Sequence, residues 1–404
     1  MSHSSIPWNK HRDSICLNPN VIQLNAGSCS PLPKKVLAKS IEYRTQLAHD
    51  PSYFLTQFAF KEIETSRNKL AQFLSCDAKN LLFFPNVSHA VNLILQKFPF
   101  KKDSQILTTS EEYPHYWSLF KELETSKGLQ FKRIKIPFHH EEELDKDALL
   151  NLFKKNRTKN TTALYFSHVS CQTGLTFPVH EICKWAQEEG LMTIIDGAHA
   201  AGFVPLDLSS LQCSFYTANI HKWMMGVTGS AFLYTQKEQR KDLEPLCWTA
   251  GYPFTDADKV CSNGLTQFAN AFEYQGTRDP TPCMCVGTSL DLFKNITLEQ
   301  RRERSFDLRK FCIEKMEETG FTLISQNHPD LSSCLLSFNF PHKIKDPMLL
   351  RTKMRDQYKV DLNFPNFEDG SFCVRFSMAW FNTHEEIEKA ISSLLHFYHQ
   401  GYLV

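Results

Sequence analysis

Short apolar runs alternate with longer amphipathic segments through much of the chain, and this alternation constrains the fold more than any other feature. The runs have the length and composition of strands buried in a parallel sheet, and they cover residues 81–84, 105–108, 163–166, 192–195 and 231–234. Helix-like segments lie between them, at residues 60–74, 89–97, 116–127 and 180–189. The alternation predicts an α/β fold.

The pattern changes after about residue 285. The elements expected there are a charged helix, two strands and a closing helix, at residues 298–318, 335–338, 373–377 and 384–398. A chain of 404 residues is also too long for one compact core. We therefore expect a large domain over residues 20–284 and a smaller α+β domain over residues 285–404. The N-terminal segment, residues 1–19, is expected to pack on the smaller domain.

Charge and cysteine content exclude several classes of protein. Lys and Arg total 45 against 44 Asp and Glu, so no net field exists to attract nucleic acid or an anionic membrane. No run of about 18 apolar residues is present, and the opening stretch lacks the apolar core of a signal peptide. The 13 cysteines show no Cys-x-x-Cys pair and no spacing suited to zinc. We expect a soluble, cytoplasmic protein with reduced thiols, no metal, and no nucleic-acid or membrane partner.

Candidate binding residues follow the predicted strands, at the sheet edge where open α/β folds bind ligands. Asp196 comes directly after the strand at 192–195. Ser88 lies where a helix opens after the strand at 81–84, and free N–H groups at such a helix start could hold a phosphate. Tyr113 follows the next strand and could stack on a flat aromatic ligand. Taken singly, each of these residues is more often a helix cap, a turn residue or ordinary core.

Lys222 changes the interpretation of this set. It lies in the run Thr217–Trp223, downstream of Asp196. An aldehyde cofactor needs an amine to hold it as a Schiff base, and a pyridine ring needs a fixed anion to stay protonated and act as an electron sink. Lys222 and Asp196 could supply these two groups, as in an enzyme that uses pyridoxal 5'-phosphate (PLP).

The ordered motifs resemble those of the class V aminotransferase family of fold-type I PLP enzymes, with the isopenicillin N epimerase-like branch as the nearest likeness. The motifs that carry the resemblance lie at residues 24–28, 196–200, 219–223, 276–282 and 375–377. The resemblance implies a large domain with a mainly parallel seven-stranded sheet and a smaller α+β C-terminal domain.

The resemblance also implies the roles of the cofactor-binding residues. Lys222 would hold the cofactor aldehyde and shuttle the Cα proton of the substrate, and Asp196 would pair with the pyridinium nitrogen. His199 would donate to the ring hydroxyl oxygen, and Tyr113 would stack on the ring. The residues implied to hold the phosphate are Val87 through its backbone N–H, Ser88, Asn219 and His221. Thr277 would reach the phosphate in the neighbouring subunit, which implies a homodimer with shared active sites.

On the substrate side, the resemblance implies that Arg375 binds the substrate carboxylate in a bidentate pair. Asn25 and Gly27 match a loop beside that carboxylate. Further substrate contacts are expected near residues 43–58 and 248–254. Cysteine desulfurases of this family carry a nucleophilic cysteine upstream of this arginine, but residues 356–372 contain no cysteine. Cys373 falls within a predicted strand, so persulfide chemistry of the desulfurase type is not expected.

The reaction that follows Cα deprotonation stays open at the level of sequence. Reprotonation at Cα, reprotonation at the cofactor carbon, and loss of a group from Cβ correspond to an epimerase, an aminotransferase and a β-lyase. Lys222 serves all three reactions. We expect an amino-acid epimerase or a C–S β-lyase, with a class V aminotransferase as the alternative. A non-catalytic protein that binds PLP or acts as a scaffold is the alternative from another class of function.

Overall fold

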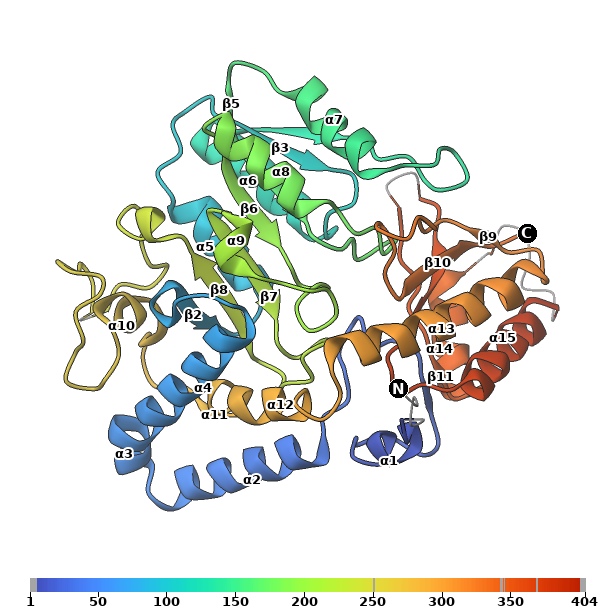
Figure 1. Ribbon diagram of the computed structural model, residues 1–404, viewed down its shortest axis with the longest axis horizontal. Helices are drawn as coiled ribbons and strands as arrows, with labels where there is room; N and C mark the ends of the chain where they lie inside the picture. Colours follow the sequence, from blue (N-terminus) through green and yellow to red (C-terminus); the bar gives the residue numbers. More distant parts are fainter. Residues whose placement is uncertain (1–5, 250, 342–343, 345, 368–369, 400–404) are drawn as a thin grey trace, which may run out of the picture.

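A seven-stranded sheet dominates the computed structural model, which describes residues 6–249, 251–341, 344, 346–367 and 370–399 (Figure 1). The strand order is β2-β8-β7-β6-β5-β3-β4, and β8 runs antiparallel to the other six strands. The strands are β2 (Leu81–Phe84), β3 (Gln105–Thr109), β4 (Gln130–Ile134), β5 (Thr161–Ser167), β6 (Met192–Asp196), β7 (Phe215–Asn219) and β8 (Ala231–Thr235). The predicted α/β fold with a mainly parallel seven-stranded sheet is confirmed.

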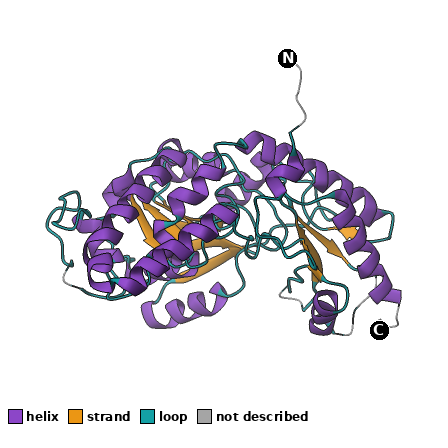
Figure 2. Ribbon diagram, turned by 90° about the horizontal axis from the view of Figure 1, so that it is seen from below, coloured by secondary structure: helices purple, strands orange, loops and turns teal. Residues whose placement is uncertain are grey.

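Both faces of this sheet are buried, which explains why its strands read as continuous apolar runs. Successive residues of a strand point to opposite faces. Leu81 and Phe83 therefore join one hydrophobic cluster, while Leu82 and Phe84 join another. Figure 2 shows helices on both sides of these strands. The helices of this part of the chain are α2 (Lys34–His49), α4 (Ala59–Phe73), α5 (Val87–Lys97), α6 (Tyr116–Lys127), α7 (Lys146–Asn156), α8 (Val179–Glu188), α9 (Leu208–Leu211), α10 (Gln267–Glu273), α11 (Thr281–Met284) and α12 (Val286–Leu292).

A second group of strands lies apart from the first (Figure 2). Three strands form an antiparallel sheet in the order β12-β10-β9, and two short strands, β1 and β11, pair in parallel. These strands are β1 (Ile22–Gln23), β9 (Thr322–Leu323), β10 (Leu335–Asn339), β11 (Val360–Asp361) and β12 (Cys373–Ser377). The helices beside them are α13 (Leu298–Glu317), α14 (Pro347–Asp356) and α15 (His384–His399). Their buried side chains form a separate hydrophobic cluster, which includes Leu308, Leu350 and Leu394.

Short elements complete the chain: α1 (Trp8–Arg12), α3 (Pro51–Tyr53), the π-helical turn η1 (Phe54–Phe58) and the 3-10 turns η2 (Ala78–Asn80) and η3 (Lys237–Gln239). Helix α1 lies close to the C-terminal elements, because Arg12 forms an ion pair of 2.5 Å with Glu386 on α15. Within the described ranges, no helix combines the length and the apolar character that crossing a membrane requires.

The domain boundary between residues 284 and 285 stays a prediction. Helix α12 begins just after this boundary yet packs against α4 and α2, beside the large sheet. Strand β1 begins near the other predicted boundary yet pairs with β11. Residues 1–5 and 400–404 of the predicted domains lie outside the described residues.

Candidate active site

Loops at the carboxyl ends of five strands that run in the same direction, β2, β3, β5, β6 and β7, meet strand β12 of the smaller sheet around a cavity of about 540 Å³. Ligands of α/β proteins bind at this edge of the sheet. The sequence-predicted residues that line the cavity are Gly27, Val87, Ser88, Tyr113, Asp196, His199, Asn219, His221, Lys222 and Arg375. The structure therefore brings most of the predicted site together, from segments far apart in the sequence.

Lys222 follows strand β7, and its Nζ lies 2.9 Å from Nε2 of His199. Burial lowers the pKa of Lys222 to about 8, while nearby Cys171 and Asp196 oppose this shift. Burial also lowers the pKa of His199 well below its ordinary value, and the charge of Lys222 acts in the same direction. A lysine with a lowered pKa carries more neutral amine near pH 7, and the neutral amine is the form that attacks an aldehyde.

Asp196 ends strand β6 and is 4% exposed. Its Oδ1 accepts a hydrogen bond of 2.9 Å from the Ala198 N–H, and its Oδ2 accepts one of 3.5 Å from the Tyr165 hydroxyl. Burial raises the pKa of Asp196. The next residue must be glycine, because a Cβ on Gly197 would lie 2.3 Å from the ring of Tyr216. The carboxylate is thus fixed in place, and a cationic ring nitrogen beside it would offset the cost of its burial.

Helix α5 points its N-terminus at the same cavity edge, where backbone N–H groups and the helix dipole favour an anion. The Val87 N–H donates to Asn219 Oδ1 at 3.1 Å. Ser88 Oγ accepts a 3.3 Å hydrogen bond from the Tyr116 hydroxyl. His221 Nδ1 lies 3.1 Å from the carbonyl oxygen of Ser230, and burial lowers the pKa of His221 to about 4. These groups surround a position suited to a phosphate.

Arg375 lies on β12 and is 3% exposed. Its Nη2 donates to Asn25 Oδ1 and to Ser28 Oγ, both at 3.3 Å, and its Nη1 donates to the carbonyl oxygen of Cys171. Its Nε has no hydrogen-bond partner among the described residues. Asn25 does not line the cavity, but its hydrogen bond helps to hold the guanidinium of Arg375 in position. Gly27 lies in the same loop as Asn25 and Ser28 and packs closely on β12, because a Cβ at this position would come within 2.8 Å of Ser377 Oγ.

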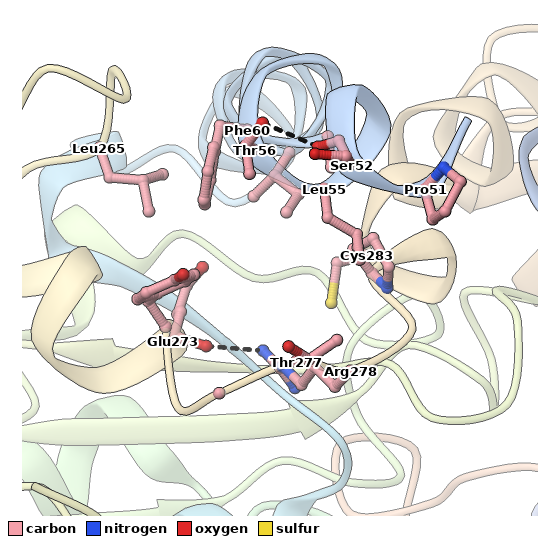
Figure 3. A pocket seen from close by; sticks show the side chains of 15 residues that line it. Pro51, Ser52, Leu55, Thr56, Phe60, Leu265, Glu273, Thr277, Arg278 and Cys283 are labelled. Carbon is pink, nitrogen blue, oxygen red and sulfur yellow. Dashed lines mark hydrogen bonds between the residues drawn. The ribbon is translucent and has the colours of Figure 1, made fainter. Parts of the chain in front are cut away.

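Thr277 lies elsewhere, in a second cavity of about 300 Å³ (Figure 3). This cavity also contains Arg278, whose Nη2 donates to the carbonyl oxygen of Glu273 at 3.2 Å. Thr277 therefore does not reach the Lys222 cavity of its own chain, and its predicted role in a neighbouring subunit stays a prediction. Residues 51–56 line the second cavity in part.

The expected substrate contacts near residues 43–58 and 248–254 are not found around Lys222. Among the residues that the structure describes, neither segment lines that cavity; residue 250 lies outside them. The first segment lies instead along α2, α3 and η1, on the side of the second cavity. Helix α3 packs against α2, and η1 packs against α2 and α4, so the predicted substrate contacts of this segment stay a prediction.

Sequence reasoning missed several residues that line the Lys222 cavity, among them Tyr116, Cys171, Gln172 and Arg351. Cys171 and Gln172 follow strand β5, so the rule that ligands gather after parallel strands could have found them. Burial raises the pKa of the Cys171 thiol to about 12, so this sulfur stays protonated near pH 7. No pattern in the sequence pointed to Arg351, because helix α14 is brought to the cavity only by tertiary packing.

The residues present fit PLP on three separate observations. The buried Asp196 carboxylate suits the ring nitrogen, the lysine of lowered pKa suits the aldehyde, and the N-terminus of α5 suits the phosphate. In addition, His199 Nδ1 is buried without a hydrogen-bond partner among the described residues, and it can serve a ring oxygen.

This fold and this cavity define a PLP-dependent enzyme of fold type I. The chain belongs to the class V aminotransferase family, whose model matches residues 22–390. It is similar to an isopenicillin N epimerase of Amycolatopsis lactamdurans, at 30% identity over 96% of this chain and 98% of that protein. It is also similar to a hercynylcysteine sulfoxide lyase of Schizosaccharomyces pombe, at 21% identity over 94% of this chain and 95% of that protein.

The fold is shared with a solved structure of C-DES, a variant with glycine covalently linked to its PLP cofactor. The TM-score is 0.82 at 18% identity, over 95% of this chain and 98% of that one. Together, the family and the relatives make this protein a PLP-dependent enzyme that acts on amino acids. The sequence-based predictions of family, fold type, cofactor and enzyme class are confirmed.

Proposed function

We propose that the protein is an amino-acid epimerase or C–S β-lyase in which Lys222 moves the Cα proton and Arg375 binds the α-carboxylate of the substrate. The observation that carries this proposal is the meeting of Lys222, Asp196 and Arg375 around one cavity. The similarity to an epimerase and to a sulfoxide lyase supports the same two reactions. A scaffold has no physical need for these three groups at one site.

The side chains divide the work as follows. Arg375 orients the substrate through its carboxylate, and Asn25 and Ser28 hold the guanidinium in position. Lys222, once free as an amine, takes the proton from Cα, and His199 at 2.9 Å fixes the position of its Nζ. Bound PLP supplies the electron sink that stabilises negative charge at Cα. Asp196 stabilises the cationic ring nitrogen on which that sink depends.

The fate of the substrate then separates the two reactions. Return of the proton to the opposite face of Cα gives the epimer, whereas departure of a thiol or sulfenate group from Cβ gives the lyase product. A persulfide on the enzyme is not part of either route. Burial raises the pKa of both Cys171 and Cys373 to about 12, so neither offers a thiolate near pH 7.

Proton exchange at Cα tests the shared first step. The PLP-loaded protein is incubated with single L-amino acids and cysteine S-conjugates in deuterated water, and deuterium at Cα is measured by mass spectrometry. At least one compound should exchange, and Lys222→Ala should abolish that exchange. Chiral analysis then detects a D-isomer from an epimerase, and pyruvate with a released sulfur compound indicates a lyase. No exchange with any compound would refute the proposal, and a keto acid with pyridoxamine phosphate would identify an aminotransferase.

We also infer that the active unit is a homodimer, because Thr277 lies in the segment 276–282 that resembles a family motif, yet it lies away from the Lys222 cavity of its own chain. Sedimentation at micromolar concentration should give the mass of two chains. In addition, Thr277→Val should weaken PLP binding although the threonine does not line that cavity in its own chain. A monomer that binds PLP normally would contradict this inference.

A cytoplasmic location is the last part of the proposal. All 13 cysteines are free thiols, which is the usual state in a reducing compartment. Fractionation of cells with an antibody to the chain should place the protein with cytoplasmic markers, and recovery with an oxidising compartment would contradict it.

A further inference from the structure

Arg351 lines the Lys222 cavity from helix α14. Leu350 and Met354 of this helix are buried in the hydrophobic cluster of the smaller sheet. The helix is therefore fixed by its apolar side, while Arg351 is exposed. Asn363 and Pro365, in the segment that follows β11, line the cavity together with Arg351. A long cationic side chain is thus held at the cavity by a packed helix. This helix belongs to the smaller sheet, whereas the loops around Lys222 belong to the larger one.

Each of the other charged side chains in the cavity is assigned to a group of the cofactor or the substrate. Lys222 takes the cofactor aldehyde, Asp196 the ring nitrogen, and Arg375 the α-carboxylate. Arg351 has no such task, and among the described residues none forms a hydrogen bond or an ion pair with it. Asp196 is the one acidic side chain, within the described ranges, that lines this cavity. After these assignments, the described residues offer no anionic partner for the positive charge of Arg351.

Arg351 is close enough to affect the other arginine. Burial lowers the pKa of Arg375, and the charge of Arg351 acts in the same direction. Two guanidinium groups that repel each other across a cavity are stabilised when each receives its own anion. A single α-carboxylate on Arg375 would leave the second group unmatched.

Asn363 adds a donor beside Arg351. Its Oδ1 already accepts a hydrogen bond of 2.9 Å from the Phe364 N–H, so its Nδ2 is the end of the amide that can serve a ligand. Its backbone is held against β12, because the Arg375 N–H donates to its carbonyl oxygen at 2.8 Å. A guanidinium with an amide N–H next to it is a donor set that suits a carboxylate.

We propose that Arg351, assisted by Asn363, binds an anionic group on the side chain of the substrate. The substrate class is then an amino acid with a distal carboxylate, held at both ends by arginines: the α-carboxylate by Arg375 and the distal one by Arg351. This proposal rests on the proposed function for the α-carboxylate end, and it adds the chemistry of the distal end.

Matched substrate pairs test it. S-carboxymethyl-L-cysteine and S-carbamoylmethyl-L-cysteine have nearly the same shape and differ by one charge, as do L-glutamate and L-glutamine. For each pair, two quantities are measured with the PLP-loaded protein: the rate of Cα deuterium exchange and the dissociation constant by calorimetry. The wild type should prefer the charged member of at least one pair by about tenfold in both quantities, as expected for one charge-assisted hydrogen bond that stays partly hydrated.

Two arginine variants separate a specific contact from a general effect of charge. Arg351→Gln should reduce the preference to about onefold to twofold. Arg355→Gln is the matched control, since Arg355 lies on the same helix, is exposed and does not line the cavity; the preference should survive there. Equal handling of both members by the wild type, or a preference that survives in Arg351→Gln, would overturn the proposal. Exchange confined to amino acids with uncharged side chains would overturn it as well.

The two measurements keep this inference distinct from the proposed function. If no compound exchanges its Cα proton, the proposed function fails. Calorimetry still tests whether Arg351 binds a distal carboxylate. Tighter binding of the charged member, lost in Arg351→Gln and kept in Arg355→Gln, supports the distal site in that case. Binding without such a difference refutes it.

Discussion

Nζ of Lys222 and Nε2 of His199 lie 2.9 Å apart, with the imidazole buried at 3% exposure. An amine and an imidazole at this distance cannot both carry a proton without strong repulsion. The lowered pKa of each group agrees with this geometry. Because the pKa of His199 lies well below its ordinary value, the imidazole is the neutral member of the pair and can accept a hydrogen bond from Lys222, whose own pKa is lowered mainly by burial.

The pH dependence of PLP uptake follows from the lowered pKa of Lys222. Because burial lowers the pKa of Lys222 to about 8, the neutral fraction falls about tenfold for each pH unit below 8 and is nearly constant above it. The second-order rate of PLP uptake, measured by absorbance after the cofactor has been removed, should rise with pH and level off near pH 8. A rate that keeps rising towards 10.5, the ordinary value for lysine, would contradict the assigned environment.

Arg375→Lys should raise KM by about 10–100-fold, because it replaces a forked contact worth about 1.5–3 kcal/mol by a point charge. The visible spectrum of the bound cofactor should not change, since Arg375 is assigned to the substrate. Steady-state kinetics with an exchanging amino acid and an absorbance spectrum check both parts. A changed spectrum with unchanged KM would move Arg375 to the cofactor.

Asp196→Asn should weaken PLP binding and lower kcat together. The amide can still accept the Ala198 N–H but carries no charge for the ring nitrogen. Loss of one partner of a buried charge pair costs about 3–5 kcal/mol, so kcat should fall by at least about 100-fold. Equilibrium dialysis and turnover measure the two effects. Wild-type behaviour would show that the ring does not lie beside Asp196.

Glu111 is predicted to position Arg375 through a loop. Ser170 Oγ donates to Glu111 Oε2 at 2.6 Å, Thr173 Oγ1 donates to the same oxygen, and Cys171 between them accepts from Arg375. Glu111→Ala removes the buried carboxylate that accepts from both hydroxyls and should reduce the free energy of unfolding by about 2–4 kcal/mol.

The same substitution should raise KM more than it lowers kcat, because the loop orients the substrate-binding arginine. Glu111→Gln should restore most of both properties, since burial raises the pKa of Glu111 and so favours a neutral group there. Urea unfolding and steady-state kinetics measure these effects. A glutamine variant as impaired as the alanine variant would argue that the full charge is required.

The sequence predicts the parts of the fold whose environment is uniform. Strands 81–84 and 192–195 are buried on both faces, so they appear as continuous apolar runs, and Asp196 could be located from the end of its strand. Two strands of this sheet were not predicted: β7 is buried but carries the polar residues Thr217 and Asn219 among its five, and β4 lies at the edge of the sheet and carries Gln130, Lys132 and Arg133. A polar edge strand gives no periodic signal.

The limits at the site have a similar cause. The residues after parallel strands share one edge by topology, which makes Lys222 and Asp196 predictable neighbours. Arg351 reaches them only because α14 packs on the smaller sheet through Leu350 and Met354. Such a contact depends on tertiary packing and leaves no trace in spacing along the chain.

Reduction of the PLP-loaded protein with borohydride, followed by digestion and mass spectrometry, tests the central claim most directly. The account predicts a phosphopyridoxyl group on the peptide that contains Lys222, and no such label in Lys222→Ala. Protein that takes up no PLP, or a label on a peptide that carries another lysine, would contradict it.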